Sequence, residues 1–200
     1  EDSPLSPGSP YARTKYIVEM ILEDFTRASA MKVLSLRYFN PIGTDPKLRS
    51  GQQLEKPSHV LAKLLEAWSK GETFTVTGVD WPTRDGSGIR DFIHVWDLAQ
   101  AHVAALEGFD KATANSSYEV FNIGTGNGVT VKELAASFEA ISGDALSVAE
   151  GPSRPGDVAG VYTVSSKAKD VLGWEAKLTE QEAVRDAIAW LPVRKEMLGY

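Results

Sequence analysis

The sequence contains no cysteine, so neither a disulfide nor a thiolate metal site can form in these 200 residues. Its three histidines, His59, His94 and His102, stand in separate segments without the spacing of a metal site, and we expect no bound metal. No apolar run approaches the roughly 20 residues that cross a bilayer, and no charged-then-apolar leader opens the chain. These absences favour a cytoplasmic protein without a membrane partner.

Basic residues are outnumbered, with 21 Lys and Arg against 27 Asp and Glu, a net charge of -6, and they form no basic run. A nucleic acid is therefore not the expected partner, whereas a small anionic ligand needs only a few local arginines. Apolar residues make up 42% and charged residues 24%, as in ordinary globular proteins. The chain begins at Glu1 without a methionine, and we expect it to be part of something longer.

A Tyr-x-x-x-Lys pair stands at the start of a predicted helix. Ser9 suits the N-cap and Pro10 the first helical position, and apolar residues follow at helical spacing. Tyr11 and Lys15 are four positions apart, so they are neighbours on one helix face. A positive charge one turn away favours the phenolate form of a tyrosine, which makes the pair a candidate base. Taken alone, the same spacing also fits a solvated helix face.

Strand-like and helix-like segments alternate along the rest of the chain, which predicts an α/β fold with short crossovers. The first strand should stop at Asn40-Pro41, and Pro192 should end the last helix. Too few strands are present for a large parallel sheet, so the chain looks like the second half of a nucleotide-binding sheet. Strands are predicted at 32–39, 74–78, 90–95, 118–123 and 158–164, and helices after Ser9, at 60–70, from an Asp97 cap, after Thr130 and after Thr179.

A glycine-rich turn, Gly124-Thr125-Gly126-Asn127-Gly128, follows the strand at 118–123. It invites comparison with the dinucleotide fingerprint Gly-x-Gly-x-x-Gly. The third glycine of that fingerprint would fall at position 129, which is Val129. We therefore do not expect this turn to be the main phosphate loop.

Five motifs together resemble the UDP-glucose 4-epimerase family of extended short-chain dehydrogenases/reductases. The resemblance spans essentially the whole chain and corresponds to the C-terminal portion of such an enzyme. The motifs are Ser9-Pro10-Tyr11-x-x-x-Lys15, Leu36-Arg37-Tyr38-Phe39-Asn40-Pro41-x-Gly43, Gly86-x-Gly88-x-Arg90-Asp91-Phe92-Ile93-His94-Val95-x-Asp97-Leu98-Ala99, Phe121-Asn122-Ile123-Gly124-x-Gly126 and Arg154-x-Gly156-Asp157.

The resemblance implies a fold and a division into domains. The expected fold is α/β: the C-terminal part of a Rossmann-type doubly wound sheet plus a smaller α/β substrate-binding domain. Residues 1–45 and 93–130 would belong to the Rossmann-type part, and 46–92 and 131–200 to the UDP-sugar-binding domain. The glycine-rich loop for the NAD pyrophosphate would lie before residue 1, so we expect these residues alone to bind NAD weakly and to be inactive.

The resemblance also implies a reaction, the interconversion of UDP-glucose and UDP-galactose by transient oxidation at C4 with NAD. Tyr11 would be the catalytic base and Lys15 its partner, and both would contact the cofactor. Tyr38 and Phe39 would flank the nicotinamide. The complete enzyme would be a homodimer. Two alternatives remain open: a UDP-sugar-binding fragment without catalysis, or a related sugar-nucleotide 4,6-dehydratase or decarboxylase.

The expected UDP-hexose contacts are spread over several segments. Two arginines converging on a pyrophosphate make chemical sense, because guanidinium groups bind phosphate oxygens bidentately. Val161 would lie beside the 2-substituent of the sugar, where a small residue leaves room for an N-acetyl group. His59 departs from the asparagine common in the family. The implied substrate residues are Asn40, His59, Val60, Thr75, Val76, Thr77, Arg90, Arg154, Asp157 and Val161.

Overall fold

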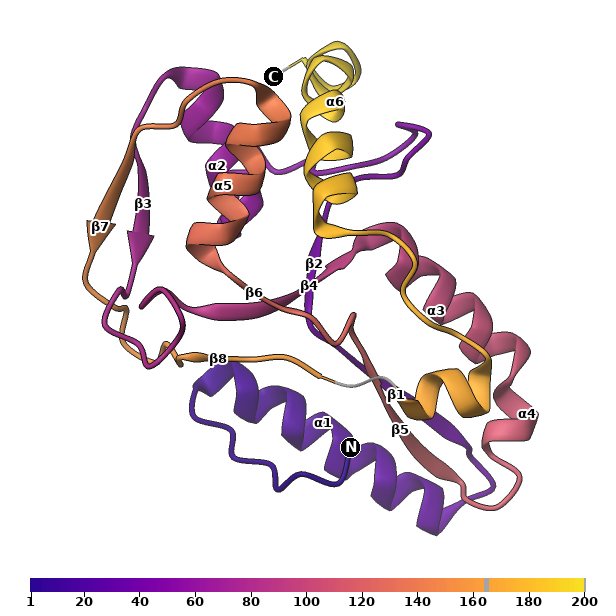
Figure 1. Ribbon diagram of the computed structural model, residues 1–200. Coiled ribbons are helices and arrows are strands. Elements are labelled where there is room, and N and C mark those ends of the chain that lie inside the picture. Colours follow the sequence, from indigo (N-terminus) through magenta and orange to yellow (C-terminus); the bar gives the residue numbers. More distant parts are fainter. Residues whose placement is uncertain (164–165, 200) are drawn as a thin grey trace.

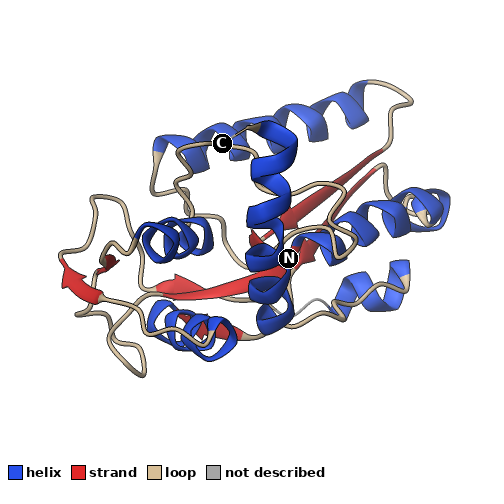
Figure 2. Ribbon diagram, turned by 90° about the horizontal axis from the view of Figure 1, so that it is seen from above, coloured by secondary structure: helices blue, strands red, loops and turns tan. Residues whose placement is uncertain are grey.

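The computed structural model describes residues 1–163 and 166–199 and has an α/β fold, with short sheets between helices (Figure 1). Figure 2 shows helices on both sides of the central strands. The helices are α1 Pro10–Ala28, α2 Val60–Lys70, α3 Val95–Glu107, α4 Phe109–Ala112, α5 Val131–Ser142, the π-helical η1 Ala168–Leu172 and α6 Glu180–Leu198. The strands are β1 Val33–Tyr38, β2 Asn40–Ile42, β3 Phe74–Thr77, β4 Ile89–His94, β5 Tyr118–Ile123, β6 Gly128–Thr130, β7 Val148–Gly151 and β8 Gly160–Val161.

Parallel pairing dominates, which confirms the α/β prediction. Strand β1 pairs with β5, and β3 pairs with β7, both in parallel. Strand β4 is parallel to β2 and β8 and antiparallel to β6. Among the described residues, no helix is long and apolar enough to cross a membrane. The predicted strand at 158–164 shortens to β8, and Val164 lies outside the described residues.

The first strand ends at Tyr38, before Asn40-Pro41, as predicted, but the sequence did not predict that Asn40 begins a second strand. The chain bends at Phe39, whose N–H still reaches the carbonyl of Ile123 at 3.2 Å, and continues as β2. Asn40 then pairs with Phe92 of β4. Pro41 is tolerated because β2 lies at an edge of its sheet, where one N–H needs no partner. One continuous segment therefore passes from the β1–β5 pair to the sheet around β4.

Helix starts follow the sequence closely, with one exception. The side chain of Ser9 accepts from the Ala12 N–H, and capping boxes open α5 at Thr130 and α6 at Thr179, as the sequence predicts. Helix α3, however, begins earlier than the predicted Asp97 cap. His94 is its N-cap and accepts the Trp96 N–H at 3.0 Å. The carboxylate of Asp97 instead accepts the N–H groups of Lys177 and Leu178, just before α6. No local sequence pattern reveals this long-range contact.

The buried apolar residues form two cores. The larger one packs α2, α5 and α6 against β3 and β4, and the smaller one packs α3 and η1 against β5. Fully buried members of the larger core include Leu64, Val76, Leu134 and Phe138, and those of the smaller core include Ile93, Phe121 and Ile123. Residues 92 and 93 of β4 belong to different cores, so this strand joins the two.

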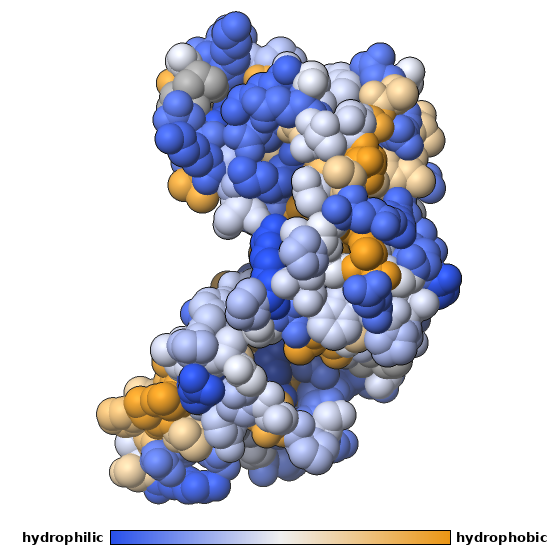
Figure 3. Space-filling view, turned by 90° about the vertical axis from the view of Figure 1, so that its left-hand side faces the viewer, coloured by the Kyte–Doolittle hydropathy of each residue, from blue (hydrophilic) through white to orange (hydrophobic). Residues whose placement is uncertain are grey.

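Helix α1 leaves an apolar face uncovered. Only Thr26 of its residues is buried, whereas apolar side chains along most of its length are more than a third exposed. Figure 3 shows apolar surface on the lower lobe, the part of the molecule that contains α1. An apolar face of this extent is typical of an interaction surface. Its members are Tyr16, Ile17, Val18, Met20, Ile21 and Phe25.

Helix α6 does not end at Pro192, contrary to the sequence prediction. It runs to Leu198 with the proline inside it. A proline in a helix interior removes one backbone hydrogen bond and crowds the preceding turn, but the packing of Val184, Ala187 and Trp190 into the fold holds the helix together.

We expect Pro192→Ala to raise the free energy of unfolding by about 2 kcal/mol, because alanine restores the missing hydrogen bond and is the better helix former. Urea denaturation of the two chains measures the difference. Pro82→Ala, in an exposed turn segment, is the control and should leave stability unchanged or slightly lower. A less stable Pro192→Ala chain would contradict the prediction.

Candidate functional site

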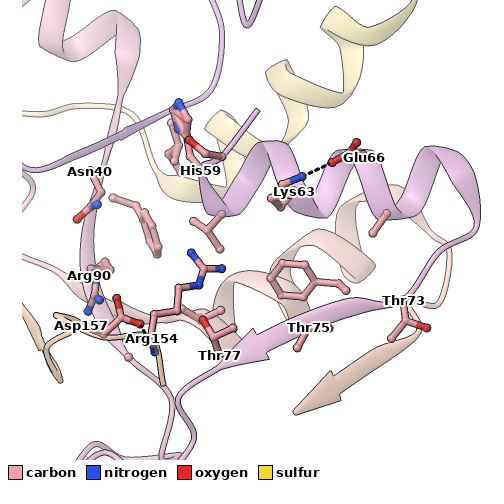
Figure 4. A pocket seen from close by; sticks show the side chains of 18 of the residues that line it. Asn40, His59, Lys63, Glu66, Thr73, Thr75, Thr77, Arg90, Arg154 and Asp157 are labelled. Atoms are coloured by element: carbon pink, nitrogen blue, oxygen red, sulfur yellow. Dashed lines mark hydrogen bonds and ion pairs between the residues drawn. The ribbon is translucent and has the colours of Figure 1, made fainter. Parts of the chain in front are cut away.

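A cavity of about 480 Å³ opens between α2, β3 and β4 (Figure 4). Residues from segments far apart in the sequence line it. Those that the sequence predicted for a substrate and that the structure brings together here are Asn40, His59, Val60, Thr75, Thr77, Arg90, Arg154 and Asp157.

Two predicted substrate residues stand apart from the cavity lining. The side chain of Val76 is fully buried in the larger core, because alternate residues of β3 point to opposite faces. Only its backbone can face a ligand. Val161 lies on β8, 55% exposed, directly opposite Arg90 in the strand pairing. Its contact with a sugar stays a prediction.

Arg90 supplies a partly buried positive charge. Its guanidinium donates to the carbonyls of Ile89 at 2.7 Å, Val158 at 3.3 Å and Ala159 at 3.4 Å. Burial lowers the pKa of the Arg90 guanidinium, and the nearby carboxylate of Asp157 partly opposes that effect. The group is therefore a cation held by backbone carbonyls at the cavity wall.

Arg154 and Asp157 form a tight turn at the cavity. The Asp157 carboxylate accepts the Arg154 N–H at 3.2 Å, and the Asp157 N–H donates to the Arg154 carbonyl at 3.0 Å. Figure 4 shows the Arg154 side chain extending into the cavity toward α2, with Arg90 and Asp157 beside each other near Asn40. Two guanidinium groups thus face one cavity, an arrangement suited to phosphate oxygens.

A lysine at the cavity wall is already neutralised. Glu66 accepts from Lys63 at 2.6 Å and from Lys70 at 2.8 Å. Hydrogen bonds from the two ammonium groups lower the pKa of Glu66 from 4.5 to about 2. The positive charge available to a ligand consequently comes from Arg90 and Arg154 rather than from Lys63.

Sequence reasoning missed several lining residues. Lys63 lies one helical turn after His59, and Phe92 lies two positions after Arg90 on the same face of β4, so periodicity could have found both. Trp81 carries no such signal, because it reaches the cavity from an irregular segment. The missed lining residues include Ser58, Lys63, Glu66, Thr73, Phe74, Trp81, Phe92 and Val131.

The Tyr11 and Lys15 side chains lie together on the first turns of α1. The Lys15 ammonium is 5.3 Å from the centre of the Tyr11 ring, as the four-residue spacing predicts. Tyr11 is 71% exposed, and Tyr38, at the end of β1, is also exposed. The described residues that line the cavity do not include Tyr11, Lys15, Tyr38 or Phe39. Their chemical roles stay predictions.

The glycine-rich turn after β5 surrounds a carboxylate of this same chain. Asp91 is fully buried and accepts the N–H and hydroxyl of Thr125 at 2.8 and 2.7 Å. It also accepts the N–H groups of Gly126 at 3.1 Å and Thr163 at 3.2 Å. The amides of this turn are therefore already used. In the described part of the chain, no group of three or more His, Cys, Asp or Glu could hold a metal ion.

The chain matches a family and its curated relatives. The NAD dependent epimerase/dehydratase family matches residues 1–124. UDP-glucose 4-epimerase 2 of Arabidopsis thaliana is 42% identical over 193 residues, 95% of this chain and 55% of that protein. UDP-glucose 4-epimerase of Bacillus subtilis is 40% identical, over 95% of this chain and 56% of that protein. The chain spans just over half the length of these relatives.

Solved structures agree with the fold. UDP-glucose 4-epimerase from Bifidobacterium longum, in complex with NAD+ and UDP, is 35% identical with a TM-score of 0.89, covering 100% of this chain and 59% of that one. The Stenotrophomonas maltophila enzyme, with bound NAD and formylated UDP-arabinopyranose, is 32% identical with a TM-score of 0.91, covering 98% and 59%. These matches support the predicted Rossmann-type α/β fold.

The cluster around Glu66 predicts a pH effect on stability. Because the pKa of Glu66 falls from 4.5 to about 2 on folding, its contribution is complete above pH 4.5 and is lost as pH falls toward 2. We expect Glu66→Gln to make the melting temperature fall less steeply than in the parent between these pH values.

Thermal melts across that range measure the effect. The control is Glu107→Gln, an exposed glutamate that forms no ion pair with any described residue. Parallel pH curves for the parent and Glu66→Gln would contradict the prediction.

Proposed function

The chain belongs to the NAD dependent epimerase/dehydratase family, and we propose that it is the C-terminal portion of an NAD-dependent UDP-hexose 4-epimerase. The proposal is that such an enzyme interconverts UDP-glucose and UDP-galactose. The observation that carries it is the meeting of Arg90 and Arg154 at one cavity with Asn40 and Asp157. Two such cations suit the charged oxygens of a pyrophosphate, and Asn40 and Asp157 offer polar partners to a nucleoside.

In this proposal the cavity holds the UDP part of the substrate. Arg90 and Arg154 bind the pyrophosphate, and Arg90 exchanges its longer bonds, to the carbonyls of Ala159 and Val158, for bonds to charged oxygens. Asp157 and the backbone of β3, including that of Val76, offer acceptors and donors to the nucleoside. The remaining proposed contacts are Asn40, His59, Val60, Thr75 and Thr77, which line the cavity. Val161, opposite Arg90, is then placed to limit the size of the sugar.

The residues on α1 and β1 fit the nicotinamide end of NAD. Tyr11 and Lys15 present a phenol and an ammonium close together and open to solvent, and Tyr38 adds an exposed ring. The pyrophosphate end of NAD has no comparable place in the described residues at the glycine-rich turn, because Asp91 occupies its amides. We propose that residues preceding this chain in a longer protein supply that place.

The proposed chemistry of the chain itself is proton transfer. Tyr11 accepts the proton of the sugar 4-hydroxyl and returns it, and the positive charge of Lys15 favours the phenolate while its ammonium binds a ribose hydroxyl. When bound, NAD supplies a hydride acceptor for C4. A UDP-sugar-binding chain without catalysis is the second candidate, favoured by the occupied glycine-rich turn.

The exposed apolar face of α1 supports a longer assembly. We propose that a preceding Rossmann-type half and a second copy in a homodimer cover this face. In that arrangement residues 1–45 and 93–130 complete the nucleotide-binding domain, whereas 46–92 and 131–200 form the UDP-sugar-binding domain. Most of the larger core comes from 46–92 and 131–200 and most of the smaller core from 93–130, but Ile42 joins the larger one and Ala168 and Trp174 join the smaller one.

We expect this chain to bind UDP, and Arg154→Gln to weaken binding at least tenfold, about 1.4 kcal/mol, because a charge-assisted contact to phosphate is lost. Isothermal titration calorimetry measures the dissociation constant. Arg84→Gln is the matched control, since Arg84 pairs with Glu133 outside the cavity lining. Equal UDP affinity in the parent and Arg154→Gln would count against the proposed cavity.

A second prediction concerns the base. In the longest natural polypeptide that carries this sequence, Tyr11→Phe should lower epimerase turnover about 10²–10⁴-fold while leaving UDP affinity nearly unchanged. The control is Tyr16→Phe, another exposed tyrosine on α1. A fall of less than tenfold in Tyr11→Phe would rule Tyr11 out as the base.

A further inference from the structure

Asp91 is a buried carboxylate with no place in the proposed chemistry. It is fully inaccessible to solvent, yet it accepts four hydrogen bonds. One oxygen receives both donors of Thr125, and the other receives the N–H groups of Gly126 and Thr163. Burying a charge is costly unless it is fully hydrogen-bonded, so this arrangement requires all its donors in position.

The two segments that meet at Asp91 are far apart in the sequence. One is the glycine-rich turn after β5, and the other is the chain just after β8. The glycines make the meeting possible: a Cβ on Gly124 would lie 2.5 Å from the Asp91 carboxylate and 2.6 Å from the Thr163 side chain. Gly126 adopts a φ of +79°, which other residues rarely take. The turn resembles a phosphate loop because its N–H groups bind an anion, and here that anion is the Asp91 carboxylate of the same chain.

Arg90 and Asp91 serve opposite faces of one strand. Alternate residues of β4 point to opposite sides, and Arg90 and Phe92 face the cavity. Asp91 points the other way, to the turn and Thr163. Thr163, which donates to Asp91, lies two residues after Val161, the partner of Arg90 in the strand pairing. The hydrogen bond to Asp91 therefore anchors this segment beside Arg90.

That segment, residues 154–163, is attached to β4 through short contacts, including the carbonyls of Val158 and Ala159, which accept from the Arg90 guanidinium at 3.3 and 3.4 Å. Strand β8 is two residues long, and its pairing with β4 involves only Ile89 and Arg90. The Ile89 N–H also donates to the Ala159 carbonyl at 2.8 Å. Beyond β8, and within the described residues, the Thr163 N–H donates to the Asp91 carboxylate and holds the end of the segment. Arg154 and Asp157 are carried by this segment to the cavity.

We propose that Asp91 is a positioning residue that clamps residues 154–163 against β4, and so holds Arg154, Asp157 and Val161 in register with Arg90 for the UDP-sugar. The inference rests on the proposed function for its ligand. The attachment of residues 154–163 by Asp91 does not depend on the proposed function. Asp91 touches neither the cavity nor, in this proposal, the substrate.

Asp91→Asn tests the clamp with little change in shape. An amide nitrogen replaces one acceptor oxygen and would face N–H donors that need an acceptor. Asp97→Asn is the matched control. Asp97 is likewise a buried carboxylate that accepts two backbone N–H groups, from Lys177 at 2.8 Å and Leu178 at 2.7 Å, but it lies outside the cavity lining.

Two measurements on this chain are needed, UDP affinity by calorimetry and hydrogen–deuterium exchange of the peptide covering 154–163. We expect Asp91→Asn to lose about tenfold or more in UDP affinity and to exchange faster in that peptide. Asp97→Asn should lower the melting temperature comparably but keep both the affinity within about twofold and the slow exchange. Loss of affinity in both variants would indicate general destabilisation and overturn the proposal.

A folded Asp91→Asn chain with parental affinity and parental exchange would also overturn it. If Asp91→Asn does not fold, Thr125→Val provides the test, because it removes the hydroxyl donor to Asp91 and keeps the three N–H donors; the other bond that it removes, from the Asn127 N–H, lies within the exposed turn. It should raise exchange at 154–163 and weaken UDP binding a few-fold, and no change in either would contradict the clamp. If the parent itself does not bind UDP, the proposed function fails. Hydrogen–deuterium exchange of the peptide covering 154–163 then tests by itself whether Asp91 holds this segment.

Discussion

Strand β4 is the constraint on which the rest of this structure depends. It pairs with β2, β6 and β8 and contributes to both cores. Because its residues alternate between two faces, consecutive positions have different tasks: Arg90 faces the cavity, Asp91 is bonded to two distant segments, and Phe92 returns to the cavity side. A shift of this strand by one residue would exchange these environments, and the buried Asp91 carboxylate would lose its hydrogen-bond donors.

Charge in the cavity is distributed by local partners rather than by composition. The chain is acidic overall, at -6, yet two guanidinium groups meet where a ligand would sit. Lys63 is neutralised by Glu66, whereas the hydrogen bonds of the Arg90 guanidinium in the described residues go to carbonyl oxygens, with the Asp157 carboxylate nearby. A small anionic ligand is therefore compatible with a chain whose net charge is negative.

The uncovered face of α1 and the openness of Tyr11 have a common cause. Helix α1 contacts β1 and β5 on one side, and its other side bears apolar residues without a partner in the described chain. The relatives are longer, and this chain covers 55% and 56% of the two compared. An exposed base cannot exclude water, which is why the proposed catalysis requires more surface than these residues provide.

The sequence by itself determined the helix starts at Ser9, Thr130 and Thr179, the α/β pattern and the Tyr11–Lys15 pairing, because caps and periodicity act within a few residues. Only the tertiary structure decided the rest. It carried the chain through Asn40-Pro41 into β2, kept α6 helical through Pro192, and gave the α3 cap to His94 instead of Asp97. The tertiary structure also placed the Asp91 carboxylate against the N–H groups of the glycine-rich turn. Each of these outcomes depends on partners distant in the sequence, such as Phe92, Lys177 and Thr163, and local patterns carry no information about long-range contacts.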